Sequence, residues 1–509
     1  MTLCSSLAAR VLVVSLAVLT ASAAPAAAQT PAPAPPQPPP AAPAGPKPIA
    51  LGNDIVFATA IRTRTYGWDW FGDADEGDYT YQGTQIRFGV TQTRKKYDWQ
   101  LEFEVPFMIN LPTTAVKPPP QGQLGLGASY YAANGNSENP IHLFLKQGTI
   151  RFKGLGGIAG QSLKVGRFEF NDALEVTPRN PSIVVLNRDR VSQRILGNFG
   201  FSDVLRSFDG AQYTLAMPKY TITGVAARPT EGVFQVNGWN ELDINVFYGS
   251  VMGNSGTDKN SRTWRVLGMG YHDYRDNAPK TDNRPAAVRN ADTKSINIAT
   301  FGGHVIQLVG TSSGPVDLMF WGVGQTGSWG ALSHRASAMA AEIGWQPSAL
   351  RKLKPWLRAA YNYDSGDSNP NDNKHGTFMQ MLPTARIYAR TPFFNLMDTV
   401  DAFGEVILRP HPRLTLRSDV HQLTLASKND LWYSGGGAFQ PNTFGMSGRP
   451  SNGHSDLSTL IDLSGDIIVN RNATLGLYYG HASSGAIAKA IYPSGDALHL
   501  AFMEWLIRF

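Results

Sequence analysis

Along most of this chain, apolar or small side chains alternate with polar ones in segments of roughly ten to fifteen residues. Ile86, Phe88 and Val90 alternate with polar or small residues, and the segments 99–105 and 357–364 repeat the pattern. Successive side chains of a β-strand point to opposite faces of the sheet. The two-residue period therefore predicts many strands, each with one apolar and one polar face.

Applied to the whole chain, this pattern predicts roughly eighteen strands. We expect them near residues 54–70, 81–94, 97–110, 142–154, 161–170, 207–217, 219–229, 241–252, 262–274, 296–311, 315–328, 332–347, 353–364, 399–410, 413–425, 456–469, 473–483 and 497–509. After residue 50 no run of 18 apolar residues occurs, which excludes helical membrane spans. The predicted fold is all-β, a transmembrane antiparallel β-barrel of about 18 strands with short periplasmic turns and long extracellular loops. Alternating faces also explain why the chain is only 42% hydrophobic.

The lengths of the connections provide a second test of the barrel. In such barrels, short periplasmic turns alternate with longer extracellular loops. Most predicted connections obey this rule, and the long ones are 111–141, 170–206, 275–295, 365–398 and 426–455. The stretch 253–261 is too long for its side, so the predicted register is weakest there.

The N-terminal residues predict export from the cytoplasm. Arg10 precedes an apolar run, and Ala28 ends a small-residue cleavage pattern, so we interpret residues 1–28 as a signal peptide. A membrane anchor is the alternative, but the apolar run is too short to span a bilayer. Residues 29–50 are Pro-rich and predict a disordered linker, with a ligand for a partner protein as the alternative. The barrel domain is expected over 51–509.

The last strand and the tryptophans fit a membrane barrel. Met503, Trp505, Ile507 and the final Phe509 fall on one face of the last strand by the two-residue period. A terminal aromatic residue on an apolar outward face resembles the signal by which the barrel assembly machinery recognises outer-membrane proteins. Two aromatic girdles are also expected. They would contain Trp99, Trp345 and Trp356 at the periplasmic ends and Trp68, Trp70, Trp329 and Trp432 at the outer ends.

Several stretches resemble the alginate export porin family. They are LKVGRFEF (163–170), RSFDGAQ (206–212), YNYDSGD (361–367), MLPTARIYA (381–389) and LRPHPRLTLRSDVHQLTLASKNDLWY (408–433). The resemblance implies a monomeric barrel of eighteen strands in the Gram-negative outer membrane. In its namesake members, an arginine-rich lumen conducts an anionic uronic-acid polymer. Ala385 and Arg386 stand here where many relatives have a Gly-His pair, so the pore lining is expected to differ there.

A pore acts on its cargo through inward-facing charges, because rings of Arg and Lys favour anions over cations. The candidate pore-lining cations are Arg62, Arg64, Arg87, Arg151, Lys164, Arg167, Arg188, Arg190, Arg194, Arg206, Arg358, Arg386 and Arg417. Their candidate counter-charges are Glu102, Glu104, Glu169, Asp364, Asp367 and Asp419. The alternative is that these groups form salt bridges that stiffen the wall without contacting cargo. A bulge at Gly166 would let Lys164 and Arg167 face the same side.

Two classes of function remain open. The first is a channel for anionic or sugar-like solutes, including export of a uronic-acid polysaccharide such as alginate; the second is a surface adhesin or structural outer-membrane protein. An enzyme is not expected, because His421 and Asp419 lack a nucleophile motif and are better explained as lumen residues. We predict no catalytic residue, metal site, cofactor or nucleic-acid partner. The expected partners are outer-membrane lipid, the assembly machinery through Phe509, and the solute.

Overall fold

A computed structural model describes residues 48–509 except 73–74, 193, 258, 276–279, 382–388 and 435–446. The predicted signal peptide and almost all of the predicted linker lie outside the described residues. The described chain enters regular structure at β1 (Ile49–Gly52), a short strand that pairs with the start of β2. Regular structure thus begins two residues before the expected start of the barrel domain.

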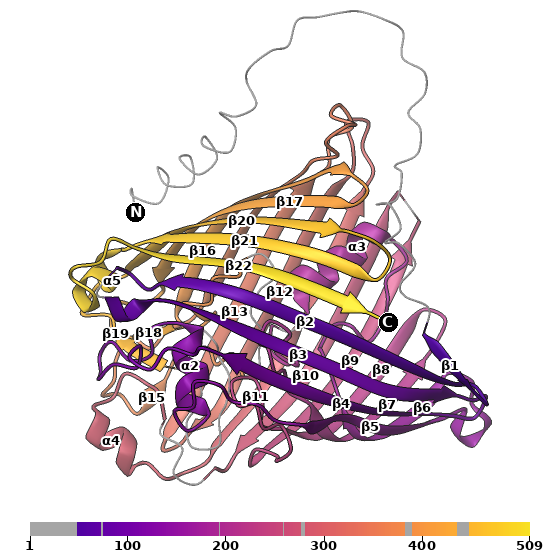
Figure 1. The fold of residues 1–509 in the computed structure, drawn as a ribbon, viewed down its shortest axis with the longest axis horizontal. Helices are drawn as coiled ribbons and strands as arrows, with labels where there is room; N and C mark the ends of the chain where they lie inside the picture. Colours follow the sequence, from indigo (N-terminus) through magenta and orange to yellow (C-terminus); the bar gives the residue numbers. More distant parts are fainter. Residues whose placement is uncertain are drawn as a thin grey trace, which may run out of the picture.

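Eighteen antiparallel strands form a closed barrel, as predicted (Figure 1). They are β2 (Ile55–Asp69), β3 (Asp78–Thr93), β4 (Tyr97–Ile109), β5 (Phe144–Lys153), β6 (Gln161–Phe168), β7 (Phe208–Ala216), β8 (Tyr220–Pro229), β9 (Ile244–Gly256), β10 (Ser261–Asp273), β11 (Ile296–Val309), β12 (Val316–Trp329), β13 (Leu332–Trp345), β14 (Trp356–Asp364), β16 (Thr399–His411), β17 (Leu414–Leu425), β20 (Asp456–Ile468), β21 (Ala473–Ser483) and β22 (Ala497–Arg508). Each strand pairs with its sequence neighbour, and β22 pairs with β2 from Ala60↔Arg508 to Asp69↔His499. Closure leaves no sheet edge in lipid.

The remaining elements belong to the connections. They are α2 (Leu126–Ala133), α3 (Pro181–Leu186), α4 (Ala286–Ala291), α5 (Ala486–Ile491), η1 (Asp75–Gly77), η2 (Leu155–Gly157), η3 (Asn187–Val191), β15 (Lys374–His375), β18 (Leu431–Ser434) and β19 (Ser447–Pro450). In Figure 1, α2, α4, α5 and the β18–β19 hairpin gather at one end of the barrel, and α3 lies towards the other. We call the first the outer end and the connections at the opposite end periplasmic turns.

The alternation predicted from the sequence is clearest in β13. From Leu332 to Trp345, every second residue is buried and the residues between are exposed. Buried side chains face the barrel interior, and exposed ones, such as Met339 and Ile343, face the membrane. The predicted strands match the observed ones within a few residues. At the weakest point, β9 continues to Gly256, so the turn to β10 contains only residues 257–260 and is short after all.

The C-terminal strand is arranged as predicted, but the aromatic girdles are not. Met503 and Phe509 are 43% and 46% exposed on the outward face of β22. Of the predicted girdle residues, Trp345 is exposed and Trp99 is half-buried. The other five, Trp68, Trp70, Trp329, Trp356 and Trp432, are buried, so the prediction is wrong for them. Sequence position placed them near strand ends, but the loops inside the barrel cover them.

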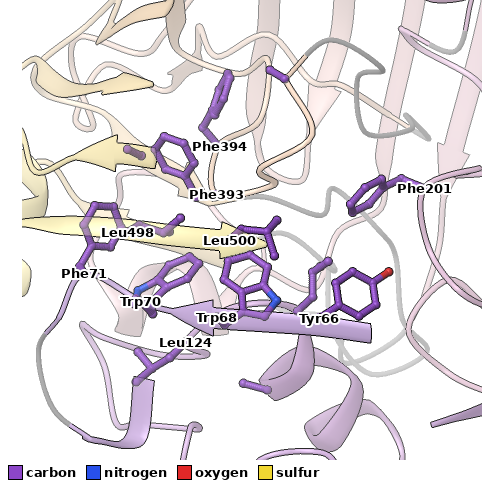
Figure 2. Close-up of a cluster of buried hydrophobic side chains, with 14 of the residues drawn as sticks. Tyr66, Trp68, Trp70, Phe71, Leu124, Phe201, Phe393, Phe394, Leu498 and Leu500 are labelled. Atoms are coloured by element: carbon purple, nitrogen blue, oxygen red, sulfur yellow. The ribbon is translucent and has the colours of Figure 1, made fainter. Parts of the chain in front are cut away.

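A cluster of buried aromatic and aliphatic side chains lies inside the barrel where β2 ends (Figure 2). Trp68 lies in β2, and Trp70 directly follows the strand and packs against Phe71. The outer loops add Phe393 and Trp432 to the cluster. The Phe71 ring lies 6.0 Å from the Trp432 ring, edge to face. The outer loops therefore fold inward onto the strands and cover this side of the lumen.

Candidate functional site

The loop between β6 and β7, residues 169–207, passes through the barrel interior, and we call it the lumen loop. The loop carries α3. The Asn180 side chain caps the start of this helix by accepting a 2.9 Å hydrogen bond from the Ser182 amide, and Pro181 occupies the first helical position. Although the loop starts at the outer end, the Ser182 hydroxyl accepts a 3.2 Å bond from Gln346, just after the periplasmic end of β13. The loop thus reaches from one end of the lumen to the other.

Six charged side chains meet where the lumen loop contacts the wall. We call Arg190, Arg194, Asp317, Glu342, Arg358 and Glu405 the constriction network. Glu342 lies 2.7 Å from Arg358, 3.6 Å from Arg190 and 3.8 Å from Arg194. Arg358 also bonds Asp317 at 2.6 Å, and Arg190 pairs with Glu405. All six side chains are buried.

The wall is shaped for this network. Asp317, Gly344 and Arg358 lie side by side on β12, β13 and β14. A Cβ atom on Gly344 would lie 2.4 Å from an Asp317 carboxylate oxygen and 2.6 Å from an Arg358 nitrogen. Only glycine leaves room for the ion pair that crosses β13.

The charges of the constriction network balance, with three guanidinium groups against three carboxylates. Taking six charges out of water is costly, and close pairing offsets that cost. Removing one partner would leave a buried charge without compensation. The network therefore holds the lumen loop against β13, β14 and β16. Beside it lies a small cavity lined by Val185, Leu186, Asp189, Arg190, Trp356, Arg358, Glu405, Ile407 and Arg417.

A second network joins β3, β4 and β5 to the start of the lumen loop. Arg87 bonds Glu102 at 2.8 Å and Glu169 at 2.9 Å. The buried Lys146 ammonium lies 3.5 Å from Glu104 and 3.6 Å from Glu169. These residues were predicted as lumen charges, except Lys146, and the structure brings them together.

A third network holds the far end of the lumen loop against β2. Arg62 donates to the Gly200 carbonyl at 2.9 Å, and Arg64 donates to the Phe201 carbonyl. Asp203 accepts from the Tyr66 hydroxyl at 2.9 Å and lies 3.7 Å from Arg62. Arg62 and Arg64 thus face the lumen loop and bind its backbone.

The remaining predicted cations of the lumen loop differ in environment. Arg188 is half exposed and pairs with Asp189 at 2.5 Å. Arg417 of β17 lies 3.7 Å from the same Asp189. Arg206 is 1% exposed, and its three guanidinium nitrogens find no hydrogen-bond partner in the described part of the chain. Arg386 lies outside the described residues.

On β5 and β6, the positions of Arg151, Lys164 and Arg167 show that one prediction, the bulge at Gly166, is wrong. Arg151 is half exposed near the periplasmic turns, where it bonds Asp98. Pairing of β6 with β5 and β7 runs through Gly166 without a register shift, so the expected bulge is wrong. Lys164 and Arg167 consequently point to opposite faces. Arg167 bonds Asp209 at 2.7 Å and the Trp239 carbonyl at 2.7 Å, on the face opposite Lys164.

The predicted acids also separate by position. Asp364 and Asp419 are buried on inward faces of β14 and β17, whereas Asp367 lies in an outer loop. His421 bonds Asp401 at 2.9 Å, and its ring stacks on the Phe403 ring with 4.4 Å between the ring centroids. These contacts agree with a structural lumen role for His421.

Sequence reasoning missed Asp317, Glu342, Glu405, Lys146 and Asp203, which complete the three networks. Glu342 and Glu405 were detectable, because each occupies the inward position of an alternating strand. Asp203 belongs to an irregular loop, where the two-residue period does not apply.

Buried carboxyls join two outer loops. Asp430 accepts bonds from the Asp367 amide at 2.7 Å and the Tyr433 hydroxyl at 3.0 Å, and Asp398 accepts from the Ser427 amide at 2.7 Å. Burial raises the pKa of Asp430 to about 6. Burial, together with the nearby Asp430 charge, raises the pKa of Asp398 to about 10. Both loops are therefore held most firmly when these carboxyls are protonated.

Alkaline pH is expected to loosen these loops. Folding raises the pKa of these carboxyls above the value of about 4 that they have in the unfolded chain. Each one stabilises the folded loops fully at a pH below that unfolded pKa, and this stabilisation is lost as the pH rises through the folded pKa. Limited proteolysis of the outer loops, corrected with an unstructured peptide, should be faster at about pH 9 than at about pH 5. Asp398→Asn should lose most of this dependence, and an unchanged pH dependence in that variant would contradict the assignment.

Among the described residues, no helix is long and apolar enough to cross a membrane. The sequence model of a family described as alginate export matches residues 134–496. Solved structures share the fold. Pseudomonas aeruginosa OccK9 (OpdG) has a TM-score of 0.52 at 11% identity, covering 90% of this chain and 98% of that one. Acinetobacter baumannii OccAB4 has a TM-score of 0.52 at 7% sequence identity, and the match covers 90% of this chain and 99% of that one. No curated protein matches the sequence.

Proposed function

The chain belongs to the alginate export family, as an outer-membrane channel of Gram-negative bacteria, and on that premise we propose that it passes anionic or sugar-like solutes through the constriction network. Export of a uronic-acid polysaccharide such as alginate is the specific form of this proposal. The family supports a channel, and the solute is the part that we propose.

The convergence of Arg190, Arg194 and Arg358 on Glu342, where the lumen loop meets the barrel wall, carries the proposal. A planar guanidinium binds carboxylates in a bidentate manner and stays charged at any physiological pH. A solute carboxylate can replace Glu342 or Glu405 as the partner of an arginine, so passage exchanges one ion pair for another. The released carboxylates can accept hydrogen bonds from sugar hydroxyls.

The second function is a surface adhesin or structural protein. The cluster of buried aromatic and aliphatic side chains inside the barrel favours it, because a barrel whose outer loops stay closed would conduct little. A current measurement separates the two functions.

The test is the reversal potential of the refolded barrel in a planar bilayer under a salt gradient, with and without polyuronate. We expect an anion-selective current that polyuronate blocks. Arg190→Gln with Arg194→Gln should shift the reversal potential towards cation selectivity, because Arg358 alone then faces the three carboxylates Asp317, Glu342 and Glu405. Glu342→Gln with Glu405→Gln is the matched control and should shift it the opposite way.

Each outcome has a separate meaning. A current that polyuronate does not block would retain a channel but reject a polyuronate as cargo. Equal reversal potentials in both double variants would mean that the constriction network does not line the conducting path. Silence from a correctly folded barrel would favour the adhesin or structural function.

We also propose that the C-terminal residue is recognised during assembly and that the barrel is a monomer. Phe509 lies on the outward face of β22, with its backbone bonded to Thr59 of β2 at 2.9 Å. This position suits recognition by the assembly machinery. We expect a monomer, as the resemblance to the family implies.

A further inference from the structure

Positive charge gathers at the periplasmic end of the barrel. Of the eight periplasmic turns, six carry an exposed Lys or Arg at or beside the turn, namely 94–96, 217–219, 257–260, 346–355, 412–413 and 470–472. The turn after β13 alone contributes Arg351, Lys352 and Lys354. Because consecutive strands follow one another around the barrel, these turns place the cations around its circumference. We call them the periplasmic cation ring.

Among the described residues, the acidic side chains near this ring pair with Arg94 or with cations outside the ring. The described acids within two residues of these turns or in the β1–β2 turn are Asp54, Asp98 and Asp317. Each has a partner of its own, because Asp54 bonds Arg94 at 2.5 Å, Asp98 bonds Lys153 at 2.7 Å, and Asp317 bonds Arg358. Asp258 lies outside the described residues. The exposed lysines of the ring are therefore available to an anionic partner.

Aromatic side chains place the ring at the membrane surface. Tyr97, Tyr220 and Trp345 are each 39% exposed at the strand ends that border the turns. Tyr97 directly follows the ring lysine Lys96, and Tyr220 directly follows the ring lysine Lys219. Exposed Tyr and Trp residues of membrane proteins occupy the headgroup level. The lysines beside them are thus at the height of lipid headgroups, which favours a lipid over a soluble partner.

We propose that the periplasmic cation ring binds the headgroups of anionic phospholipids in the periplasmic leaflet. Lys and Arg near an anionic membrane surface attract it, and the attraction falls off within a Debye length. The site is independent of cargo passage, because it lies on the turns and outside the constriction network.

The test compares lipid retention by the full-length barrel refolded in zwitterionic micelles. Mixed phosphatidylglycerol and phosphatidylcholine are added at increasing ratios, and the bound lipids are counted by native mass spectrometry. We expect a preference for phosphatidylglycerol that weakens with salt. The variant Lys95→Gln, Lys96→Gln, Arg351→Gln, Lys352→Gln, Lys354→Gln should lose it, with about a fivefold loss of affinity per charge at a shared site.

The matched control neutralises five exposed cations at or near the outer end: Lys294, Arg335, Lys374, Lys428 and Lys489, each to Gln. It should retain the preference. Equal retention of both lipids by the natural chain, or equal losses in the two variants, would overturn the proposal. Variant-sensitive binding of soluble polyuronate without any phosphatidylglycerol preference would also overturn it, and would assign the ring to capture of cargo.

Discussion

A chain in which residues 171–205 are replaced by Asn-Gly is expected to conduct several times more current per open channel than the natural chain. The replaced segment contributes no strand to the barrel. β6 and β7 already pair up to Phe168↔Phe208, so a two-residue turn can join their short extensions. A barrel of 16–18 strands without an internal loop leaves an aqueous channel.

The measurement is single-channel conductance in a planar bilayer, after the heat-modifiable mobility of the variant has confirmed folding. Replacing α4 residues 287–290 with glycine is the control, because that helix has no buried residue and should leave conductance unchanged. Unchanged conductance in the loop variant would show that the lumen loop does not limit the pore. The gain should come with weaker solute discrimination, because Arg190 and Arg194 leave with the loop.

Glu342→Ala is expected to lower the free energy of unfolding by about 3–5 kcal/mol, the usual cost of removing one partner of a buried ion pair. Glu342 lies within 4 Å of three arginines, so its loss leaves their charges facing one another. Unfolding in urea from lipid vesicles, followed by tryptophan fluorescence, measures the change.

Two further variants make this result specific. Ile343→Val changes the adjacent lipid-facing side chain and should have a much smaller effect. Arg358→Met combined with Glu342→Ala should destabilise less than the sum of the two single changes, since they share one interaction. Additive losses, or a Glu342→Ala effect no larger than that of Ile343→Val, would contradict a stabilising network.

Much of the wall was predictable from particular residues. The alternation of Ile86, Phe88 and Val90 predicted a strand whose opposite face carries Arg87, and β3 has that register. The same rule placed Arg358 inward. The rule was less useful at strand ends, where Trp68 and Trp329 occupy inward positions although their sequence position suggested a girdle.

The sequence by itself determined the barrel, its strand number and the faces of most strands. It could do so because lipid on one side and polar groups on the other impose a two-residue period along each strand. Only the tertiary structure decided the pairing of Arg190 with Glu405, of Arg194 with Glu342 and of Arg62 with the lumen-loop backbone. Those contacts join residues far apart in sequence through an irregular loop, and no periodicity specifies where such a loop lies inside the barrel.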